Sequence, residues 1–112
     1  MVTDWTACCP PLTGGPLALE DAQRLAGVLK AIADPTRLRL LSLVAAPSGG
    51  EVCICNLTDP VGLSQPTVSH HMKVLVEAGL LTRTQRGKWA FYRLVPTALN
   101  ALATLLTTPV PA

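Results

Sequence analysis

The chain has 112 residues, 49% of them hydrophobic, and a formal net charge of +2, which suits one domain with one hydrophobic core. Its longest apolar runs, such as residues 40–46, are much shorter than the ~20 residues that span a bilayer, and its N-terminus lacks the basic and apolar regions of a secretory signal. These features argue against a membrane-spanning or secreted protein, so we expect a cytoplasmic protein without a membrane partner.

The first half of the chain predicts an arm and three helices. Residues 1–16 are rich in cysteine, proline and glycine, which cannot hold a helix, and we expect residues 1–18 to form a flexible N-terminal arm. In residues 19–33 the apolar residues recur at i, i+3, i+4 and i+7, as in a helix. Asp34 can cap a second helix with Pro35 at its first position, and leucines on several faces predict that this helix is deeply buried. A short third helix is expected within residues 53–60.

The second half predicts a capped helix, a hairpin and a last helix. Ser64 is a strong cap for a helix over residues 65–77, which has one apolar face and one polar, basic face. Gly79 closes this helix. Residues 81–94 are typical of two short strands around a turn at Gly87, with basic residues at the tip. From Pro96 to Thr107, a nearly uncharged helix carries an apolar stripe that needs a partner surface.

Positive charge is concentrated in residues 64–93, which carry five basic side chains and one acidic side chain, against four basic and six acidic ones in residues 1–63. This clustering suits a surface that meets phosphates, although a solvated basic face is the simpler alternative. Two short helices joined by a tight turn and followed by a basic hairpin predict a mainly α fold with a small β-hairpin. We identify it as a winged helix-turn-helix of order α-α-α-α-β-β-α, over residues 19–107 with a tail at 108–112.

In such a fold the fourth helix lies in the major groove of double-stranded DNA and its first turns face the base edges. Lysine and arginine on this helix and on the wing meet phosphates or the minor groove and fix the register. For His71, a partly buried and satisfied imidazole is an equally good interpretation. A winged helix used only for protein contacts is the alternative, and it predicts no salt-dependent DNA affinity. The expected base contacts are Gln65, Thr67, Ser69 and His70, and the expected phosphate or minor-groove contacts are Lys73, Arg83, Arg86 and Lys88.

Four cysteines occur as two pairs, Cys8 with Cys9 in the arm and Cys53 with Cys55 near the third helix. In a cytosolic protein such cysteines favour ligand or redox roles over structural disulfides. Their spacing is not that of a zinc finger, and thiolates select soft ions such as arsenic(III), antimony(III), cadmium, lead or copper(I). Residues i and i+2 point about 200° apart on a helix, so two sulfurs can share an ion only where the backbone is irregular or extended.

Two stretches closely resemble the ArsR/SmtB winged-helix metalloregulators: residues 33–41, Ala-Asp-Pro-Thr-Arg-Leu-Arg-Leu-Leu, and residues 63–75, Leu-Ser-Gln-Pro-Thr-Val-Ser-His-His-Met-Lys-Val-Leu. The resemblance continues through the wing to Tyr92 and covers about residues 19–106. It implies a homodimer, built through the first and last helices, that represses its operon until an inducer binds. A twofold dimer reads an imperfect palindrome. Members of this class are not enzymes, and no general base accompanies the cysteines.

The segment from Glu51 to Leu57 resembles the arsenic site of the arsenical-resistance operon repressors, and the adjacent cysteines of the arm resemble a neighbouring subgroup. The resemblance therefore implies an arsenic(III) or antimony(III) site in which Cys8 and Cys9 close over Cys53 or Cys55, from the same or the other subunit, and it leaves open which three sulfurs bind. A cadmium, lead or thiol-redox sensor of the same fold is the alternative. Residues 96–112 lack the carboxylates and histidines of other sites in the family, which argues against a zinc or nickel sensor.

Overall fold

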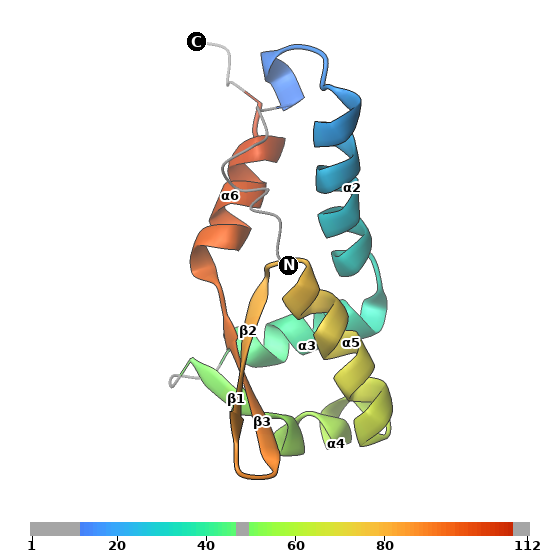
Figure 1. The fold of residues 1–112 in the computed structure, drawn as a ribbon, viewed down its shortest axis with the longest axis vertical. Coiled ribbons are helices and arrows are strands. Elements are labelled where there is room, and N and C mark those ends of the chain that lie inside the picture. Colours follow the sequence, from blue (N-terminus) through green and yellow to red (C-terminus); the bar gives the residue numbers. More distant parts are fainter. Residues whose placement is uncertain (1–11, 47–49, 109–112) are drawn as a thin grey trace.

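The computed structural model describes residues 12–46 and 50–108. The predicted order of helices and hairpin is confirmed, with one additional strand (Figure 1). In this part of the chain no helix is long and apolar enough to cross a membrane. The helices are α2 (Leu19–Ile32), α3 (Pro35–Ala45), α4 (Thr58–Val61), α5 (Gln65–Glu77) and α6 (Pro96–Leu106), the strands are β1 (Glu51–Cys53), β2 (Leu81–Arg86) and β3 (Trp89–Leu94), and the 3-10 helices are η1 (Leu12–Gly14) and η2 (Ile54–Asn56).

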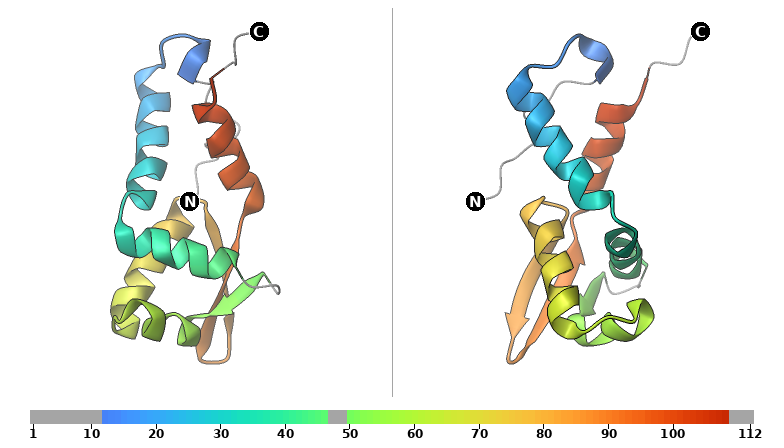
Figure 2. Two further views of the ribbon diagram at one scale, coloured as in Figure 1. Left: turned by 180° about the vertical axis from the view of Figure 1, so that it is seen from behind. Right: turned by 90° about the vertical axis from the view of Figure 1, so that its right-hand side faces the viewer.

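The elements form two ends of an elongated molecule. Helices α2 and α6 extend together from one end in every view (Figures 1 and 2), whereas α4, the start of α5 and the turn between β2 and β3 lie at the opposite end. Helix α3 crosses between the two groups (Figure 1). This arrangement keeps the start of the polar helix α5 and the tip of the basic hairpin, which the sequence assigned to DNA, at the end opposite to the one from which α2 and α6 extend.

The start of α3 follows directly from two residues. Asp34 has extended backbone, and its carboxylate accepts a 3.0 Å hydrogen bond from the backbone N–H of Arg37, while Pro35 occupies the first turn. This cap satisfies one N–H that the first turn leaves without a helical partner. The predicted cap is therefore confirmed. The same hydrogen bond lowers the pKa of Asp34 from its ordinary value of 3.8, and the positive charge of Arg37 lowers it further.

We predict that the charge of Asp34 stabilises the fold in a pH-dependent way. Because the pKa of Asp34 is depressed on folding, the stabilisation is fully present above pH 3.8 and is lost as the pH falls through the lowered pKa. An Asp34→Asn variant keeps a capping oxygen and loses only the charge, so its thermal midpoint should be about 2–5 °C lower at pH 7. Calorimetry on both proteins from pH 7 to pH 2.5 should show this gap closing, and a constant gap would contradict the prediction.

Helix α5 has the predicted bounds, but its cap is made differently. Gly62 closes α4 in the left-handed conformation, with φ +69°, a conformation that glycine adopts without strain. Ser64 stands at the N-cap position of α5, yet its hydroxyl bonds to the hydroxyl of Thr67, 3.0 Å away, and accepts nothing from the backbone. The prediction that the Ser64 side chain caps this helix is therefore wrong, while Pro66 in the first turn supports the start of the helix.

A third strand is the largest departure from the sequence prediction. Strand β1 pairs antiparallel with β3, giving the order β1-β3-β2, with Glu51 opposite Arg93 and Cys53 opposite Phe91. The helix predicted within residues 53–60 is wrong in its first half, because Cys53 ends a strand, residues 54–56 form η2, and only Thr58–Val61 are α-helical. A smaller departure is η1, which forms within the segment predicted to hold no helix.

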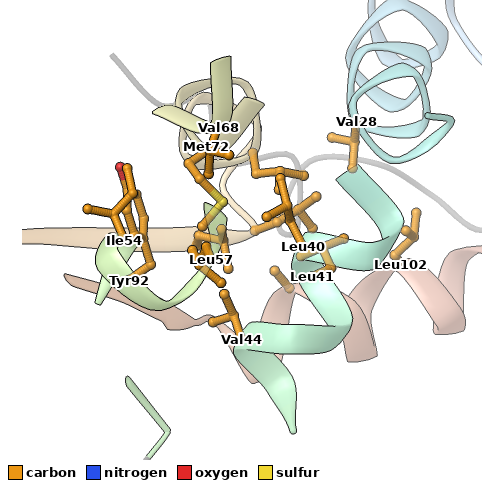
Figure 3. Close-up of a cluster of buried hydrophobic side chains, with 14 of the residues drawn as sticks. Val28, Leu40, Leu41, Val44, Ile54, Leu57, Val68, Met72, Tyr92 and Leu102 are labelled. Carbon is orange, nitrogen blue, oxygen red and sulfur yellow. The ribbon is translucent and has the colours of Figure 1, made fainter. Parts of the chain in front are cut away.

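The hydrophobic core joins every main element. Val68 and Met72 of α5 point toward Leu57 and Leu40 from the opposite side (Figure 3), and all four side chains have no exposed surface. The predicted inner face of α5 is thereby confirmed. Helix α3 buries Leu40, Leu41 and Val44 but leaves Leu38 51% exposed, so the predicted deep burial applies to one face of this helix and not to all of its leucines.

Candidate nucleic-acid interface and thiol site

The outward side of α5 carries the predicted base contacts. Gln65, Thr67 and His70 are exposed and Ser69 is half-buried, all within the first two turns of the helix. Further along, Lys73 is exposed and its Nζ lies 3.8 Å from Oε1 of Glu77. An exposed pair of this kind is weak, so it leaves the lysine available to an anion. The arrangement presents short polar side chains first and a cation behind them.

Arg37 fastens α5 to the end of α2. Its Nε donates to the carbonyl of Ala31 at 2.6 Å, its Nη2 to the carbonyl of Lys30 at 3.3 Å, and its Nη1 lies 3.2 Å from Nδ1 of His71. Because a guanidinium only donates, Nδ1 of His71 must be the acceptor. The half-buried His71 is thus a satisfied imidazole that holds the recognition helix, as one of the two interpretations predicted, and His70 beside it faces solvent.

The hairpin is the wing of the fold, and its cations have different partners. Nη2 of Arg83 donates to Oε1 of Gln85 at 2.5 Å, and Nε2 of Gln85 donates to the carbonyl of Gly87 at 3.0 Å. Nζ of Lys88 lies 5.7 Å from the centre of the Trp89 ring, within the range of a cation–π contact. These local contacts stiffen the tip of the wing while leaving the side chains of Arg83 and Lys88 exposed.

Arg86 has a stronger set of contacts, across the sheet. Its Nη2 lies 2.7 Å from Oε2 of Glu51 and its guanidinium lies 4.6 Å from the centre of the Phe91 ring. Nη2 of Arg93 lies 3.7 Å from the same carboxylate oxygen. The hydrogen bond from Arg86, followed by the charges of Arg86 and Arg93, lowers the pKa of Glu51 from its ordinary value of 4.5, so this carboxylate is charged at neutral pH.

The structure brings two of the four predicted cysteine ligands together. Cys53 and Cys55 are joined as a disulfide with 5.1 Å between their Cα atoms, and the backbone N–H of Cys55 donates to Sγ of Cys53 at 3.2 Å. Cys53 is buried, whereas Cys55 is exposed. The backbone is extended at Cys53 and turns into η2 beyond it, which confirms the requirement for an irregular backbone. Cys8 and Cys9 lie outside the described residues.

The described residues do not by themselves form a metal site. Over residues 12–46 and 50–108, no three side chains among histidine, cysteine, aspartate and glutamate converge closely enough to hold a metal ion. Reduced to thiolates, Cys53 and Cys55 would supply two sulfur ligands for a soft ion.

Sequence reasoning did not single out Arg37, Glu51 and Trp89, which contact side chains of α5 or of the wing. Arg37 lay within the family-like stretch, so its position was marked but its role was not. Glu51 is 35 residues from Arg86 and becomes its partner only through the pairing of β1 with β3. Trp89, 36% exposed beside the wing turn, could have been singled out as an aromatic residue in a basic segment.

A polar recognition helix, a helix that precedes it and a basic hairpin at the same end of the molecule define a winged helix-turn-helix DNA-binding protein. The sequence model of the arsR family of bacterial regulatory proteins matches residues 34–83, from the cap of α3 into β2. The chain belongs to the ArsR family of transcriptional repressors, which are DNA-binding regulators and not enzymes.

The similar proteins include an uncharacterized regulator and several arsenical-resistance regulators. An uncharacterized HTH-type transcriptional regulator of Methanocaldococcus jannaschii is 35% identical over 88 residues, covering 79% of this chain and 97% of that protein. The arsenic resistance transcriptional regulator ArsR1 of Pseudomonas putida is 46% identical over 62% of this chain, and the arsenical resistance operon repressor of Bacillus subtilis is 34% identical over 65%. The match spans 52% and 68% of these two regulators, respectively.

Two solved structures place the fold in the same family. The AntR antimony-specific transcriptional repressor is 30% identical, with a TM-score of 0.65 and coverage of 81% of this chain and 82% of its own. The homodimeric winged helix-turn-helix DNA-binding domain from Mycobacterium bovis is 26% identical, with a TM-score of 0.62 and coverage of 79% and 82%.

Proposed function

We propose that this protein is a homodimeric repressor that leaves its operator when arsenic(III) or antimony(III) binds its cysteine thiolates. The carrying observation is the convergence of Cys53 and Cys55 at the end of β1, directly before the helix-turn-helix. The arsenic-resistance relatives and the antimony-specific repressor support this choice of ligand. The proposed inducer site consists of Cys53 and Cys55 with a sulfur of Cys8 or Cys9 from either subunit.

Release of DNA follows from what surrounds the cysteine pair. Between and after the cysteines, Ile54 and Leu57 are buried in the same cluster as Val68 and Met72 of α5. Interiors are close-packed, so a shift of residues 53–57 must displace the helix that packs against them. A ligand that draws an arm sulfur onto Cys53 and Cys55 thus biases the position of the recognition helix. The coupling between such sites is typically about 1–3 kcal/mol, or roughly 5–150-fold in affinity.

In the proposed complex each subunit inserts α5 into one major groove. Base edges are read by Gln65, Thr67, Ser69 and His70, while Lys73, Arg83, Arg86 and Lys88 meet phosphates or the minor groove. The homodimeric structural neighbour supports a dimer, and the apolar residues Leu19, Leu29 and Leu106, exposed on α2 and α6 by 69%, 37% and 44%, favour these helices as its interface. A twofold dimer then calls for an imperfect palindrome.

A thiol-redox repressor is the second candidate, and the Cys53–Cys55 disulfide favours it. In this version two thiols lose two electrons and two protons to an oxidant and form the disulfide, with no ion required. Both candidates act on residues 53–57, which pack against α5. They differ in whether release occurs under reducing conditions.

Fluorescence anisotropy of a labelled palindromic DNA from the gene's own upstream region separates the two candidates. We expect arsenite and antimonite, added with reductant present, to release the DNA, and zinc to have little effect. Release by cadmium or lead but not by arsenite would show that the inducer is a different soft ion and would contradict the proposed ligand. Release only after reductant is withdrawn and a disulfide forms would replace it with the redox candidate.

A further inference from the structure

We propose that Glu51 is an internal competitor of DNA for Arg86, and that it links the cysteine pair to the wing. The second half of this inference rests on the proposed function, whereas the first half requires only that the protein binds DNA. Glu51 thereby becomes a positioning residue on the strand that ends at Cys53. Neither the sequence pattern nor the similarity to known regulators assigns it a role.

The strand register shows that Arg86 is turned away from the tip of the wing. Arg86 is paired with Trp89, next to the turn, but its guanidinium lies over Phe91, two residues further from the tip along β3. Its carboxylate partner lies on β1, which is separated from β2 by the whole of β3. The side chain therefore crosses the central strand toward β1 instead of extending toward the space in front of the turn.

In this conformation Glu51 competes with DNA phosphate for the positive charge of Arg86. Arg86 is 54% exposed and its carboxylate partner only 19% exposed, so the cation is accessible while the anion is held by the fold. A phosphate that takes up Arg86 must replace this ion pair and must also approach a fixed negative charge. Both effects lower DNA affinity, and an exposed pair of this kind changes it by about two- to fivefold.

The same face of the sheet connects this ion pair to the cysteines. Glu51 and Cys53 are two residues apart on β1, so their side chains share a face, and Cys53 is paired with Phe91, on which Arg86 rests. All three residues Glu51, Cys53 and Phe91 also line one pocket of about 420 Å³. A ligand that fixes Cys53 therefore fixes the strand that carries the carboxylate, which favours retention of Arg86 by Glu51.

The test is a double-mutant cycle on DNA affinity, measured by anisotropy under reductant as a function of salt. Glu51→Gln should tighten DNA binding about two- to fivefold and steepen the plot of log affinity against log salt by up to about 0.9, the value of one phosphate contact, because Glu51 lets Arg86 make this contact only in part in the wild type. In an Arg86→Gln background the same substitution should have no effect. Asp59→Asn, which removes an exposed carboxylate on α4, is the control for net charge and should not steepen the salt dependence.

Further variants and a second readout make the test decisive. Glu51→Asp keeps the charge but shortens the side chain, so it should bind DNA more tightly than the wild type if reach to Arg86 matters. Weaker or unchanged binding by Glu51→Gln and Glu51→Asp, in proteins with wild-type circular dichroism, overturns the competition, as does a gain that persists in Arg86→Gln. Arsenite should weaken DNA binding about two- to fivefold less in Glu51→Gln than in the wild type. If arsenite weakens DNA binding equally in Glu51→Gln and in the wild type, the link between Glu51 and the cysteines is overturned. If arsenite does not release the wild type from DNA, the proposed function is refuted, but the double-mutant cycle measured without arsenite still tests the competition for Arg86.

Discussion

Arsenite will fail to release operator DNA from a Cys53→Ser/Cys55→Ser variant, although this variant will bind the DNA as tightly as the wild type. The two sulfurs are the ones that the fold brings together, and the residues that we propose to contact DNA are different ones. Serine preserves size at the buried position of Cys53 and removes the soft ligand. Loss of two of three thiolates should remove the full coupling, about 5–150-fold in affinity.

The arm cysteines provide the matched comparison. A Cys8→Ser/Cys9→Ser variant removes the same number of thiols and leaves Cys53 and Cys55 intact. If a sulfur of the arm completes the site, this variant also loses release, and arsenite then binds it more weakly in a calorimetric titration. The proposal is contradicted if arsenite still releases DNA from the Cys53→Ser/Cys55→Ser variant, because the inducer site would then lie elsewhere.

Local patterns in the sequence were sufficient for most of the helices and the hairpin. The bounds of α5 agree with the prediction at both ends, and α2 and α6 each end one residue earlier than predicted. The start of α3 depends on Asp34 and Pro35, two adjacent residues with a known local effect, and Gly87 forms the hairpin turn with φ +62°. Each of these features is decided within a few residues of the chain.

Features that depend on distant pairing were not accessible in this way. Strand β1 has only three residues, too few for an alternating pattern, and exists because β3 offers it a hydrogen-bonding edge. The contacts of Arg86 with Glu51 and of Arg37 with His71 join residues 35 and 34 positions apart. For the candidate site, the sequence identified the residue types and the polar face of α5. The contact between Arg86 and Glu51 could be found only from the pairing of the strands in the sheet.

A Met72→Ala variant will lose much of the stability of the fold and, with it, DNA binding. Met72 lies on the inner face of α5, has no exposed surface and reaches toward Leu57 beneath it (Figure 3). Truncation of a fully buried methionine removes its contacts and leaves a cavity, which costs about 2–5 kcal/mol. Because the free energy of unfolding of a small domain is only about 5–15 kcal/mol, this loss is a large part of the total stability.

The opposite face of the same helix gives the control for this prediction. His70→Ala changes an exposed residue two positions away, so the free energy of unfolding in a urea titration should change by less than about 0.5 kcal/mol. Its DNA affinity should nevertheless fall, because the variant lacks a side chain that we propose to contact base edges. Met72→Ala should instead lose much of its stability, and its DNA binding should be weak because part of the protein is unfolded. This binding should recover on cooling toward the temperature of maximum stability. If Met72→Ala unfolds at the wild-type urea concentration, α5 is not anchored through its inner face, and if His70→Ala binds operator DNA with wild-type affinity, His70 is not part of the DNA interface.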